Sequence, residues 1–480
     1  MKRKFVLNIL FLIAVSIIVK AFWVIGIDRS VQNLAGEEEY GFYFSLFSFS
    51  VLFTLLLDLG IAGFNNRSVS TFPSIIKTYF SNILVIRLVA SSIYFTITLI
   101  AALLLNYSER QVFLLLVLMI NQIIASITVW LRSNISGLQH FLLDSILSVS
   151  ERFIMIILCS LVLWGGVTST PFRIEWFVYI QTFSYIFVMM VSFFIVIRLG
   201  HIKSMNIDLK VMTSIIRAGI PYAFVALFMT LYWRMDAVMI ERILPDGRIQ
   251  AGTYAQSFRL FDAFSMIPVM FGSMLLPLFS REISCGHDLR SIVSIALKML
   301  VVPAGILISS CILWPGEILD LLYRSPSHES ATVFCLLMIT LIPVSLVYIY
   351  STLLTASGNM KTLAIITGLA TAISLTLNLL FIPRLTITGS AIAALISHSF
   401  VALLCVIMVN KKMFPVGVTR NTILFCAMVG VTLLTGFICR WLQMSWLPGM
   451  ALQLIVGIIW VLSFRMIEPL KAIRLISEKP

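Results

Sequence analysis

The sequence predicts an all-α polytopic membrane protein. Fourteen apolar stretches follow one another through its 480 residues, and each approaches or exceeds the length of about 20 residues that a helix needs to cross a bilayer. Hydrophobic residues make up 60% of the chain and charged residues 11%, and the mean hydropathy is +1.03. Runs this long and this apolar favour helices over the alternating strands of a membrane barrel. Function must therefore be sought within or across the bilayer.

The predicted helices leave little chain between them, and no intervening polar segment is large enough to fold as a separate domain. The longest connection on the side of the termini, Gly200–Thr213, separates six helices from the following eight. Trp23, Trp164 and Trp314 fall near predicted helix ends, as interfacial anchors do. In order, helices are predicted over residues 5–27, 39–64, 79–105, 110–132, 138–165, 176–199, 213–243, 252–280, 290–314, 330–355, 360–382, 387–410, 420–439 and 446–464.

Lysine and arginine are divided unequally between the two sides of the predicted bundle. If the N-terminus is cytoplasmic, 20 lysine and arginine residues lie on the inner side of the membrane and 8 lie on the outer side. Every loop is short enough for the positive-inside rule to apply. Both termini are therefore predicted to be cytoplasmic. The inner residues are Lys2, Arg3, Lys4, Arg67, Lys77, Arg132, Arg198, Lys203, Lys210, Arg217, Arg281, Arg290, Lys361, Lys411, Lys412, Arg420, Arg465, Lys471, Arg474 and Lys479, and the outer ones are Arg29, Arg110, Arg173, Arg242, Arg248, Arg324, Arg384 and Arg440.

Composition and motifs exclude several classes of function. A net charge of +13 would suggest nucleic acid in a soluble protein, but here topology explains where the charge lies, so no nucleic-acid partner is expected. No H-E-x-x-H, no metal-type Cys/His spacing and no G-x-x-x-x-G-K-[ST] occurs, so no metal, cofactor or ATPase engine is predicted. A driving force would have to come from an H⁺ or Na⁺ gradient, the membrane potential or downhill consumption of a product.

Two local similarities suggest that helices 7–12 repeat helices 1–6. Gly41-Phe42-Tyr43 opens the second predicted helix and Gly252-Thr253-Tyr254 opens the eighth, while Ser136-Gly137 precedes the fifth and Ser357-Gly358 the eleventh. Six helices per half keep both halves in one orientation, as in the parallel repeats of some secondary transporters. The predicted parts are a first lobe at 1–212, a second lobe at 213–410 and a C-terminal pair of helices with a tail at 411–480.

Charged residues within predicted helices are the main functional candidates, because burying charge in a membrane is costly. They are Lys20, Asp58, Arg87, Asp144, Glu151, Arg152, Arg234, Asp236, Arg259, Asp262 and Lys298. Asp58, Arg87 and Asp144 each lie about 10 Å from the cytoplasmic end of their helix, counted at about 1.5 Å per residue. Their simplest interpretation is a structural clamp in which Arg87 neutralises a carboxylate.

A second group shares a level nearer the outer surface: Lys20, Arg234, Asp236, Arg259 and Asp262. Arg259 and Asp262 are three residues apart and could pair with each other on one helical face. Five charges at one level, three of them basic, also suit a hydrated cavity, and guanidinium groups suit phosphate. Glu151 is a candidate protonation site, and Arg152 beside it projects to a different side of the helix.

Several of these residues also carry a resemblance to a known family. The run Phe22-Trp23-Val24-Ile25-Gly26-Ile27-Asp28-Arg29 is followed by Glu39-Tyr40-Gly41-Phe42-Tyr43, Leu57-Asp58-Leu59-Gly60, Tyr232-Trp233-Arg234-Met235-Asp236 and Arg259-Leu260-Phe261-Asp262. This pattern resembles the polysaccharide-flippase branch of the multidrug/oligosaccharidyl-lipid/polysaccharide exporter superfamily. The resemblance extends over about the first 410 residues, and it is most specific at helices 1–2 and 7–8.

The resemblance implies a non-enzymatic transporter in the bacterial cytoplasmic membrane. Members of this branch move undecaprenyl-diphosphate-linked oligosaccharides from the inner to the outer leaflet by alternating access around a cationic cavity. By this resemblance Lys20, Arg234 and Arg259 become substrate-binding candidates, with Asp236, Asp262 and Glu151 as charge partners or H⁺/Na⁺ coupling groups. The expected partners are the lipid-linked substrate, membrane lipids and polysaccharide assembly enzymes such as those for O-antigen and lipopolysaccharide. The extra C-terminal helix pair would flank a groove for the polyprenyl tail.

Two other classes of function stay open from the sequence. A cation-coupled multidrug exporter of the same superfamily would favour an acidic cavity, whereas the predicted interior has six basic and five acidic groups. A membrane polysaccharide polymerase would be an enzyme and usually carries a large external loop, whereas the longest external loop here is about 16 residues.

The charge distribution makes a testable prediction of topology. Reporter fusions at Lys210 and after Pro480 should both give a cytoplasmic signal, because each lies beyond an even number of predicted spans. A matched fusion at Arg110, in a predicted outer loop, should give an external signal. An external signal at either of the first two positions would overturn the predicted number of helices.

Overall fold

The computed structural model describes residues 18–61, 65, 69, 73–166, 172–201, 207–324, 326–415 and 420–466. The chain divides into two compact units, Met1–Ala255 and Gln256–Pro480. This division follows packing, and the repeat boundaries at 212 and 410 stay a prediction. Lys2, Arg3, Lys4, Arg67, Lys203, Lys471, Arg474 and Lys479, as well as most of the first predicted helix, lie outside the described residues.

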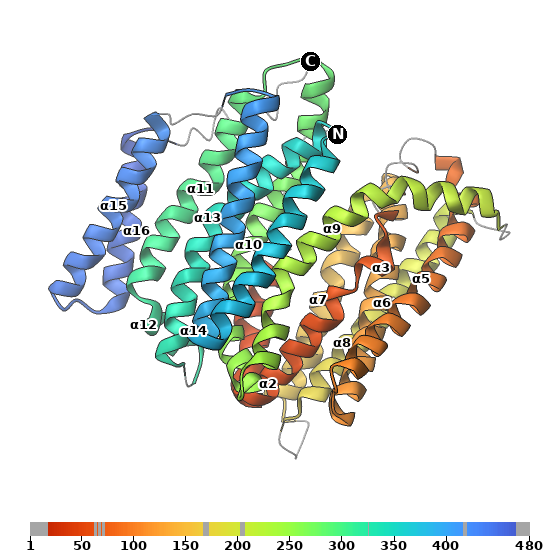
Figure 1. Cartoon of the computed structure of the whole chain (residues 1–480), viewed down its shortest axis with the longest axis horizontal. Helices are drawn as coiled ribbons and strands as arrows, with labels where there is room; N and C mark the ends of the chain where they lie inside the picture. The colour runs from red at the N-terminus through yellow and green to blue at the C-terminus, as the bar shows by residue number, and fades with distance from the viewer. Residues whose placement is uncertain are drawn as a thin grey trace. The chain divides into compact units, whose positions relative to one another are not determined.

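Every regular element in the described part is helical (Figure 1). The first unit contains a π-helix η1 (Trp23–Asp28), a 3₁₀ turn η2 (Pro73–Ile75) and the α-helices α2 (Arg29–Leu52), α3 (Leu55–Asp58), α5 (Ile76–Leu104), α6 (Glu109–Gly137), α7 (Phe141–Trp164), α8 (Ile174–Gly200) and α9 (Leu209–Ile243). Helix α10 (Gly247–Ser284) begins in the first unit and continues into the second. The second unit then contains α11 (Arg290–Leu313), α12 (Pro315–Leu322), α13 (His328–Ala356), α14 (Met360–Lys412), α15 (Arg420–Trp441) and α16 (Trp446–Ser463).

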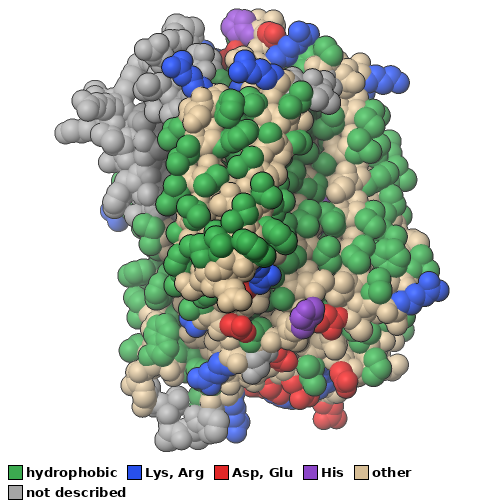
Figure 2. All heavy atoms as spheres, turned by 90° about the vertical axis from the view of Figure 1, so that its left-hand side faces the viewer, with side chains coloured by type: hydrophobic (Ala, Val, Ile, Leu, Met, Phe, Trp, Pro, Cys, Tyr) green, Lys and Arg blue, Asp and Glu red, His purple; other side chains and the backbone are tan. Residues whose placement is uncertain are grey.

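Eleven helices within the described residues are long and apolar enough to cross a membrane. On the face drawn in Figure 2, hydrophobic side chains fill a broad middle band while charged side chains gather toward its two ends. This distribution is the one that a hydrocarbon core with two polar surfaces requires. The prediction of an all-helical polytopic membrane fold is confirmed.

Helix α14 covers two of the predicted helices. Its 53 residues include a break at Thr386, where φ is 52° and ψ is −137°. Pro383 precedes the break and lacks the N–H that a helix interior needs. The predicted helices 360–382 and 387–410 lie on the two sides of this break.

The predicted helix 39–64 is interrupted in the structure. Helix α2 ends at Leu52, and only the four residues of α3 follow before Leu59 adopts a left-handed φ of 47° and Gly60 a φ of 73°. Two consecutive residues with positive φ end a helix. The apolar run continues through this turn, so hydropathy alone could not reveal it. The short helix α12 was also not predicted, because it follows the end of an apolar run.

A buried glutamine ties the C-terminal pair of helices to the rest of the second unit. The indole N–H of Trp314 donates to Gln453 Oε1 at 2.9 Å, and Gln453 Nε2 donates to the carbonyls of Thr432 at 3.1 Å and Ser309 at 3.4 Å. A side chain at Gly436 would overlap with Gln453. Helices α11, α15 and α16 therefore share one polar contact within an apolar interior, where such bonds hold membrane helices together.

Helices α2 and α10 cross within the first unit at two glycines. A Cβ atom at Gly41 would overlap with the carbonyl oxygen of Arg248, and a Cβ atom at Gly252 would overlap with that of Glu37. The two contacts are reciprocal, because each glycine touches the residue four positions before the other. Gln32 reinforces the crossing by donating to the carbonyl of Gly252 at 3.1 Å. Only glycine at both positions allows this close approach of the backbones.

The crossing makes a testable prediction. Gly41→Ala should lower the free energy of unfolding by about 1–3 kcal/mol or more, because the added methyl group meets backbone rather than a movable side chain. Thermal unfolding of the purified protein measures the change. Gly430→Ala in α15 is the matched control, because nothing lies within 4 Å of a Cβ atom there. Equal unfolding temperatures for the two variants would contradict the close crossing.

Candidate functional site

Among the described residues of the first unit, the most deeply buried cation is Arg87 on α5, whose side chain is 1% exposed. Its guanidinium forms an ion pair with Asp58. It also donates to the carbonyl of Leu57 at 3.2 Å and to the carbonyl and hydroxyl of Ser126 at 3.1 and 2.6 Å, and it lies 5.8 Å from the Trp130 ring. These contacts join α3, α5 and α6, so Arg87 and Asp58 are placed as a structural contact among helices.

Asp144 on α7, which the sequence grouped with Arg87 and Asp58, has a different partner. Arg132 Nε donates to Asp144 Oδ1 at 2.7 Å across the α6–α7 connection. Counting residues along a helix gives the depth of a side chain but not the side on which it projects. The predicted group of three is therefore divided between two ion pairs.

Lys20 lies among charges of its own unit. The charged groups that act on its amino group are Arg152, Arg132 and Glu151. The guanidinium of Arg152 lies 5.0 Å from the ring centroid of Trp23, and its Nε is 4.0 Å from Glu151 Oε1. The side chains of Lys20, Glu151 and Arg152 are all partly exposed. We call Lys20, Trp23, Glu151 and Arg152 the first-unit charge cluster.

The sequence placed Lys20 by depth with Arg234 and Arg259, and it did not select Arg152 as a binding residue. The missed signal was the spacing of Lys20 and Trp23, three residues apart and so on one helical face. An aromatic ring on that face offers a surface for a guanidinium from a neighbouring helix.

Arg234 and Asp236 lie two residues apart on α9 and have different surroundings. Asp236 is 3% exposed and accepts a hydrogen bond from the Tyr254 hydroxyl at 3.0 Å. Arg234 is half-buried, with its guanidinium 6.0 Å from the Phe47 ring centroid. Asp28 is held in a similar way, since it accepts from the Tyr40 hydroxyl at 2.8 Å. A tyrosine in the middle of α2 and another on α10 thus each donate a hydrogen bond to a buried carboxylate.

Arg259 and Asp262 belong to the part of α10 in the second unit, and both side chains are half-buried. Lys20 and Arg234 belong to the first unit. We predicted that one substrate contacts Lys20, Arg234 and Arg259 together, and this stays a prediction. The coupling roles of Asp236, Asp262 and Glu151 also stay predictions.

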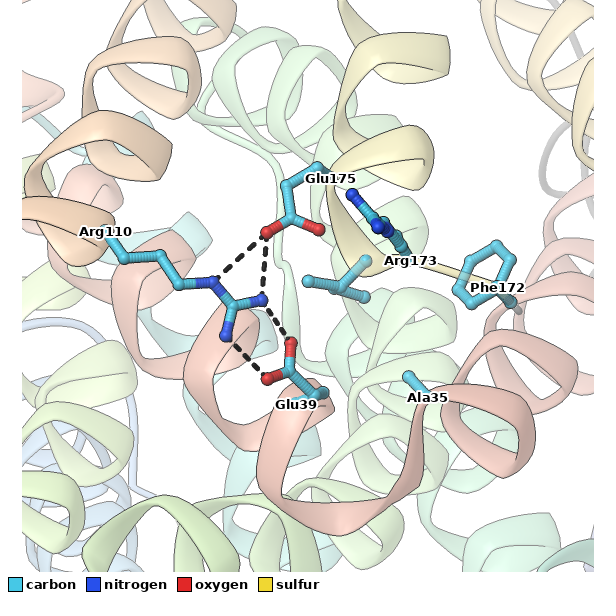
Figure 3. A pocket seen from close by; sticks show the side chains of 7 residues that line it. Ala35, Glu39, Arg110, Phe172, Arg173 and Glu175 are labelled. Atoms are coloured by element: carbon cyan, nitrogen blue, oxygen red, sulfur yellow. Dashed lines mark hydrogen bonds and ion pairs between the residues drawn. The ribbon is translucent and has the colours of Figure 1, made fainter. Parts of the chain in front are cut away.

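A further arginine cluster, which the sequence did not predict, lies at the beginning of α6 and α8 (Figure 3). Arg110 binds both carboxylate oxygens of Glu39 at 2.7 and 2.6 Å and one oxygen of Glu175 at 2.9 and 3.2 Å. Its guanidinium also lies 4.8 Å from the Phe42 ring centroid. Arg110, Glu39 and Glu175, together with Arg173, line a pocket of about 340 Å³. Bidentate pairing of this kind fixes geometry, so Arg110 ties α2, α6 and α8 together.

Metal ligation finds no support in the described part of the chain, where no three His, Cys, Asp or Glu side chains gather as a ligand set. Half-buried cations next to aromatic rings can bind an anionic group that enters the membrane region.

Comparison with known families decides the class of protein. The polysaccharide biosynthesis protein family matches residues 5–282, which is more than half of the 480 residues. The chain belongs to this family. The lipid II flippase MurJ family matches residues 237–460 of the same chain. A comparison with curated proteins gave no match.

Solved structures show the fold of this family member. Lipid II flippase MurJ in an inward closed conformation is 13% identical and superposes with a TM-score of 0.69, covering 96% of this chain and 98% of that one. An inward-facing multidrug resistance MATE transporter of the MOP superfamily gives 0.58, with 15% identity and coverage of 83% and 97%. A MOP superfamily transporter from Pyrococcus furiosus, described as having a binding pocket of reverse polarity, gives 0.56, with 12% identity and coverage of 84% and 92%.

At sequence identities of 12–15%, the similarity to these solved structures shows only that the chain shares their fold. The match to the polysaccharide biosynthesis family shows the family to which the chain belongs. The polysaccharide biosynthesis family member is thus a multi-pass membrane protein with the fold of the lipid II flippase MurJ and of MOP superfamily transporters. The family that the sequence motifs indicated is confirmed.

Replacing Arg87 tests its structural role. Arg87→Met should lower the free energy of unfolding by about 3 kcal/mol, because the buried carbonyls and Asp58 lose a charged donor. Arg87→Lys should restore only part of the stability, since one ammonium cannot reproduce the guanidinium fork. Thermal unfolding in detergent measures both, with exposed Arg281→Met as the control. A normally stable Arg87→Met protein that has lost transport would indicate a functional role instead.

Proposed function

We propose that this protein flips undecaprenyl-diphosphate-linked oligosaccharides from the inner to the outer leaflet of the bacterial cytoplasmic membrane for surface polysaccharide biosynthesis. O-antigen of lipopolysaccharide is one such product. The observation that carries the proposal is the first-unit charge cluster, in which Arg152 lies 5.0 Å from the Trp23 ring centroid and Lys20 precedes Trp23 by three residues on the same helix. A soluble sugar chain needs no such cations, whereas a diphosphate does.

The proposed cycle is alternating access by two six-helix lobes related by a parallel repeat, within a bundle of fourteen helices whose two ends are cytoplasmic. The reciprocal contacts of Gly41 and Gly252 support the repeat, because they occur at the positions that the sequence similarity aligned. Arg87 and Arg110 support a first lobe that moves as one body, since each joins three of its helices. A substrate that binds the two lobes differently in each state would bias the equilibrium between states.

Energy coupling is proposed to use an H⁺ or Na⁺ gradient or the membrane potential. Glu151, Asp236 and Asp262 are the candidate coupling groups. Glu151 is partly exposed and adjacent to Arg152, so a change in its protonation would alter the net positive charge offered to a diphosphate. Asp236 is buried and held by Tyr254, which suits a charge partner better than a site in contact with water.

The C-terminal helices α15 and α16 are proposed to flank the polyprenyl tail. Their outer faces carry large exposed apolar side chains, which are Ile423, Leu434, Phe437, Ile438, Leu447, Ile455, Ile458, Ile459 and Leu462. Gln453, in contrast, faces inward and joins both helices to α11. One face is thus fixed to the protein while the other suits hydrocarbon, whether lipid or substrate tail.

The test is export by variants of the proposed binding cations. Arg152→Ala, Arg234→Ala and Arg259→Ala should each reduce export about 10- to 100-fold, which corresponds to losing one charge-assisted hydrogen bond. Lipid-linked oligosaccharide on the inner leaflet of cells should rise while its synthesis continues. Lysine at each position should rescue partly, because the charge survives without the fork. Exposed Arg281→Ala is the matched control, and immunoblots should show normal membrane levels throughout.

Two outcomes would contradict this proposal. If Arg259 serves only to neutralise Asp262, the Arg259→Ala, Asp262→Ala double variant would export at the wild-type rate, and Arg259 would lose its place in the site. Complete translocation with short, unpolymerised glycan in cells lacking the protein would favour a polymerase.

A further inference from the structure

The beginning of α9 differs from the rest of that helix. Its first part, residues 209–220, carries Lys210 and Arg217 among its apolar residues, whereas residues 223–243 include a stretch apolar enough to cross a membrane. Figure 1 shows this first part crossing the ends of the neighbouring helices of the first unit before α9 turns along the bundle. A helical segment placed across the ends of membrane helices lies at the level of the lipid headgroups.

One face of this segment is fixed to the protein. Val211, Met212, Ile215 and Ile216 pack on the hydrophobic core that includes Phe80. The connection before the segment is also held, because the Asp208 N–H donates to the buried Asn82 side chain at 2.8 Å. The segment is therefore an ordered, amphipathic part of the first unit.

The opposite face carries four exposed polar side chains: Lys210, Thr213, Ser214 and Arg217. Their spacing of three, four and seven residues places them on one side of a helix. Together they line a pocket of about 440 Å³. We call these four residues the α9 basic face.

In the described part of the chain, no carboxylate forms an ion pair with the side chain of Lys210 or of Arg217. Asp208 accepts a hydrogen bond from the Lys210 backbone N–H at 2.8 Å and so caps the helix. The Thr213 hydroxyl donates to the carbonyls of Leu209 and Lys210 at 3.0 Å. Ser214 makes no such bond within the described residues, so its hydroxyl can donate to a ligand. Two cations and a hydroxyl on one face match the acceptor oxygens of a phosphate group.

The neighbours of the α9 basic face point to the source of that phosphate. Ile207 is 62% exposed, Leu209 73%, Ile220 43% and Phe224 52%. Large apolar side chains beside exposed cations are typical of a surface that contacts headgroups and acyl chains together. A soluble phosphate would use only the polar half of this surface.

From these observations we propose that the α9 basic face binds the phosphate of an anionic phospholipid, with Lys210 and Arg217 contacting the phosphate, Ser214 donating to it and the apolar neighbours contacting the acyl chains. This lipid is a bound component of the first unit, distinct from any transported substrate. The proposal does not depend on what the protein transports.

Binding of phosphatidylglycerol to the purified full-length protein tests the proposal. Native mass spectrometry should show phosphatidylglycerol retained in preference to phosphatidylcholine. The Lys210→Gln, Arg217→Gln variant should bind it about 30-fold more weakly, since each basic residue near a membrane surface contributes about 1 kcal/mol. The matched control is Arg281→Gln, Lys411→Gln, which removes two exposed cations from the second unit and should leave binding unchanged.

Ser214→Ala distinguishes a headgroup site from general attraction between opposite charges. It leaves the net charge unchanged, so weaker binding of phosphatidylglycerol by this variant supports a specific contact. Equal losses in both double variants, or no loss in Ser214→Ala, would overturn the site in favour of diffuse electrostatics. Displacement of the lipid by millimolar inorganic phosphate would overturn the lipid as the ligand. Thermal unfolding of each variant confirms that it is folded, and Lys210→Arg, Arg217→Lys should retain binding.

Discussion

The close approach of α2 and α10 at Gly41 and Gly252 is the constraint on which the first unit depends. Because the backbones touch, neither helix can turn its crossing face away, and their polar side chains are fixed relative to one another. Phe42 beside the crossing then lies between the guanidinium groups of Arg110, at 4.8 Å, and Arg248, at 5.2 Å. A contact made of backbone resists sliding but can act as a pivot, since it offers no interlocking side chains. The alternating access proposed above would need such a pivot.

The arginines of the first unit fall into two groups by what surrounds them. Arg87, Arg110 and Arg132 each form a close ion pair, and these pairs join neighbouring helices. Arg152 and Arg234 also lie over the rings of Trp23 and Phe47, and Arg152 Nε is 4.0 Å from Glu151 Oε1. An ion pair neutralises a cation, whereas an aromatic face stabilises it without removing its charge. The aromatic contacts of the second group hold the two guanidinium groups in place within the first unit.

The class of fold and the family could both be predicted from the sequence. Long apolar runs form helices in a membrane, and the motifs at the predicted helices 1–2 and 7–8 indicate the family. The sequence was not sufficient to predict which charged side chains form ion pairs with one another. Asp144 and Arg87 share a depth, yet Asp144 pairs with Arg132, since which neighbour a side chain meets depends on helix rotation. The hydropathy pattern also did not predict the turn at Leu59, whose φ is positive. The turn interrupts an apolar run, and no polar residue marks its position. Arg110 was assigned to a loop by charge alone, while its two carboxylate partners come from 71 and 65 residues away.

Helix α9 connects three of these features along one continuous helix, which bends between its first part and its membrane-spanning part (Figure 1). At about 1.5 Å per residue its 35 residues extend about 50 Å. The basic face lies at its beginning, Gly219 lies directly against the carbonyl of Leu59, and Arg234 and Asp236 follow in the membrane-spanning part. Near the end, Glu241 accepts from Gln111 on α6 at 2.9 Å. A lipid held at the first turn would thus bear on the same helix that carries a proposed substrate cation. The proposed lipid site and Arg234 therefore lie on a helix that side-chain hydrogen bonds hold at both ends, from Asn82 at the beginning and from Gln111 near the end.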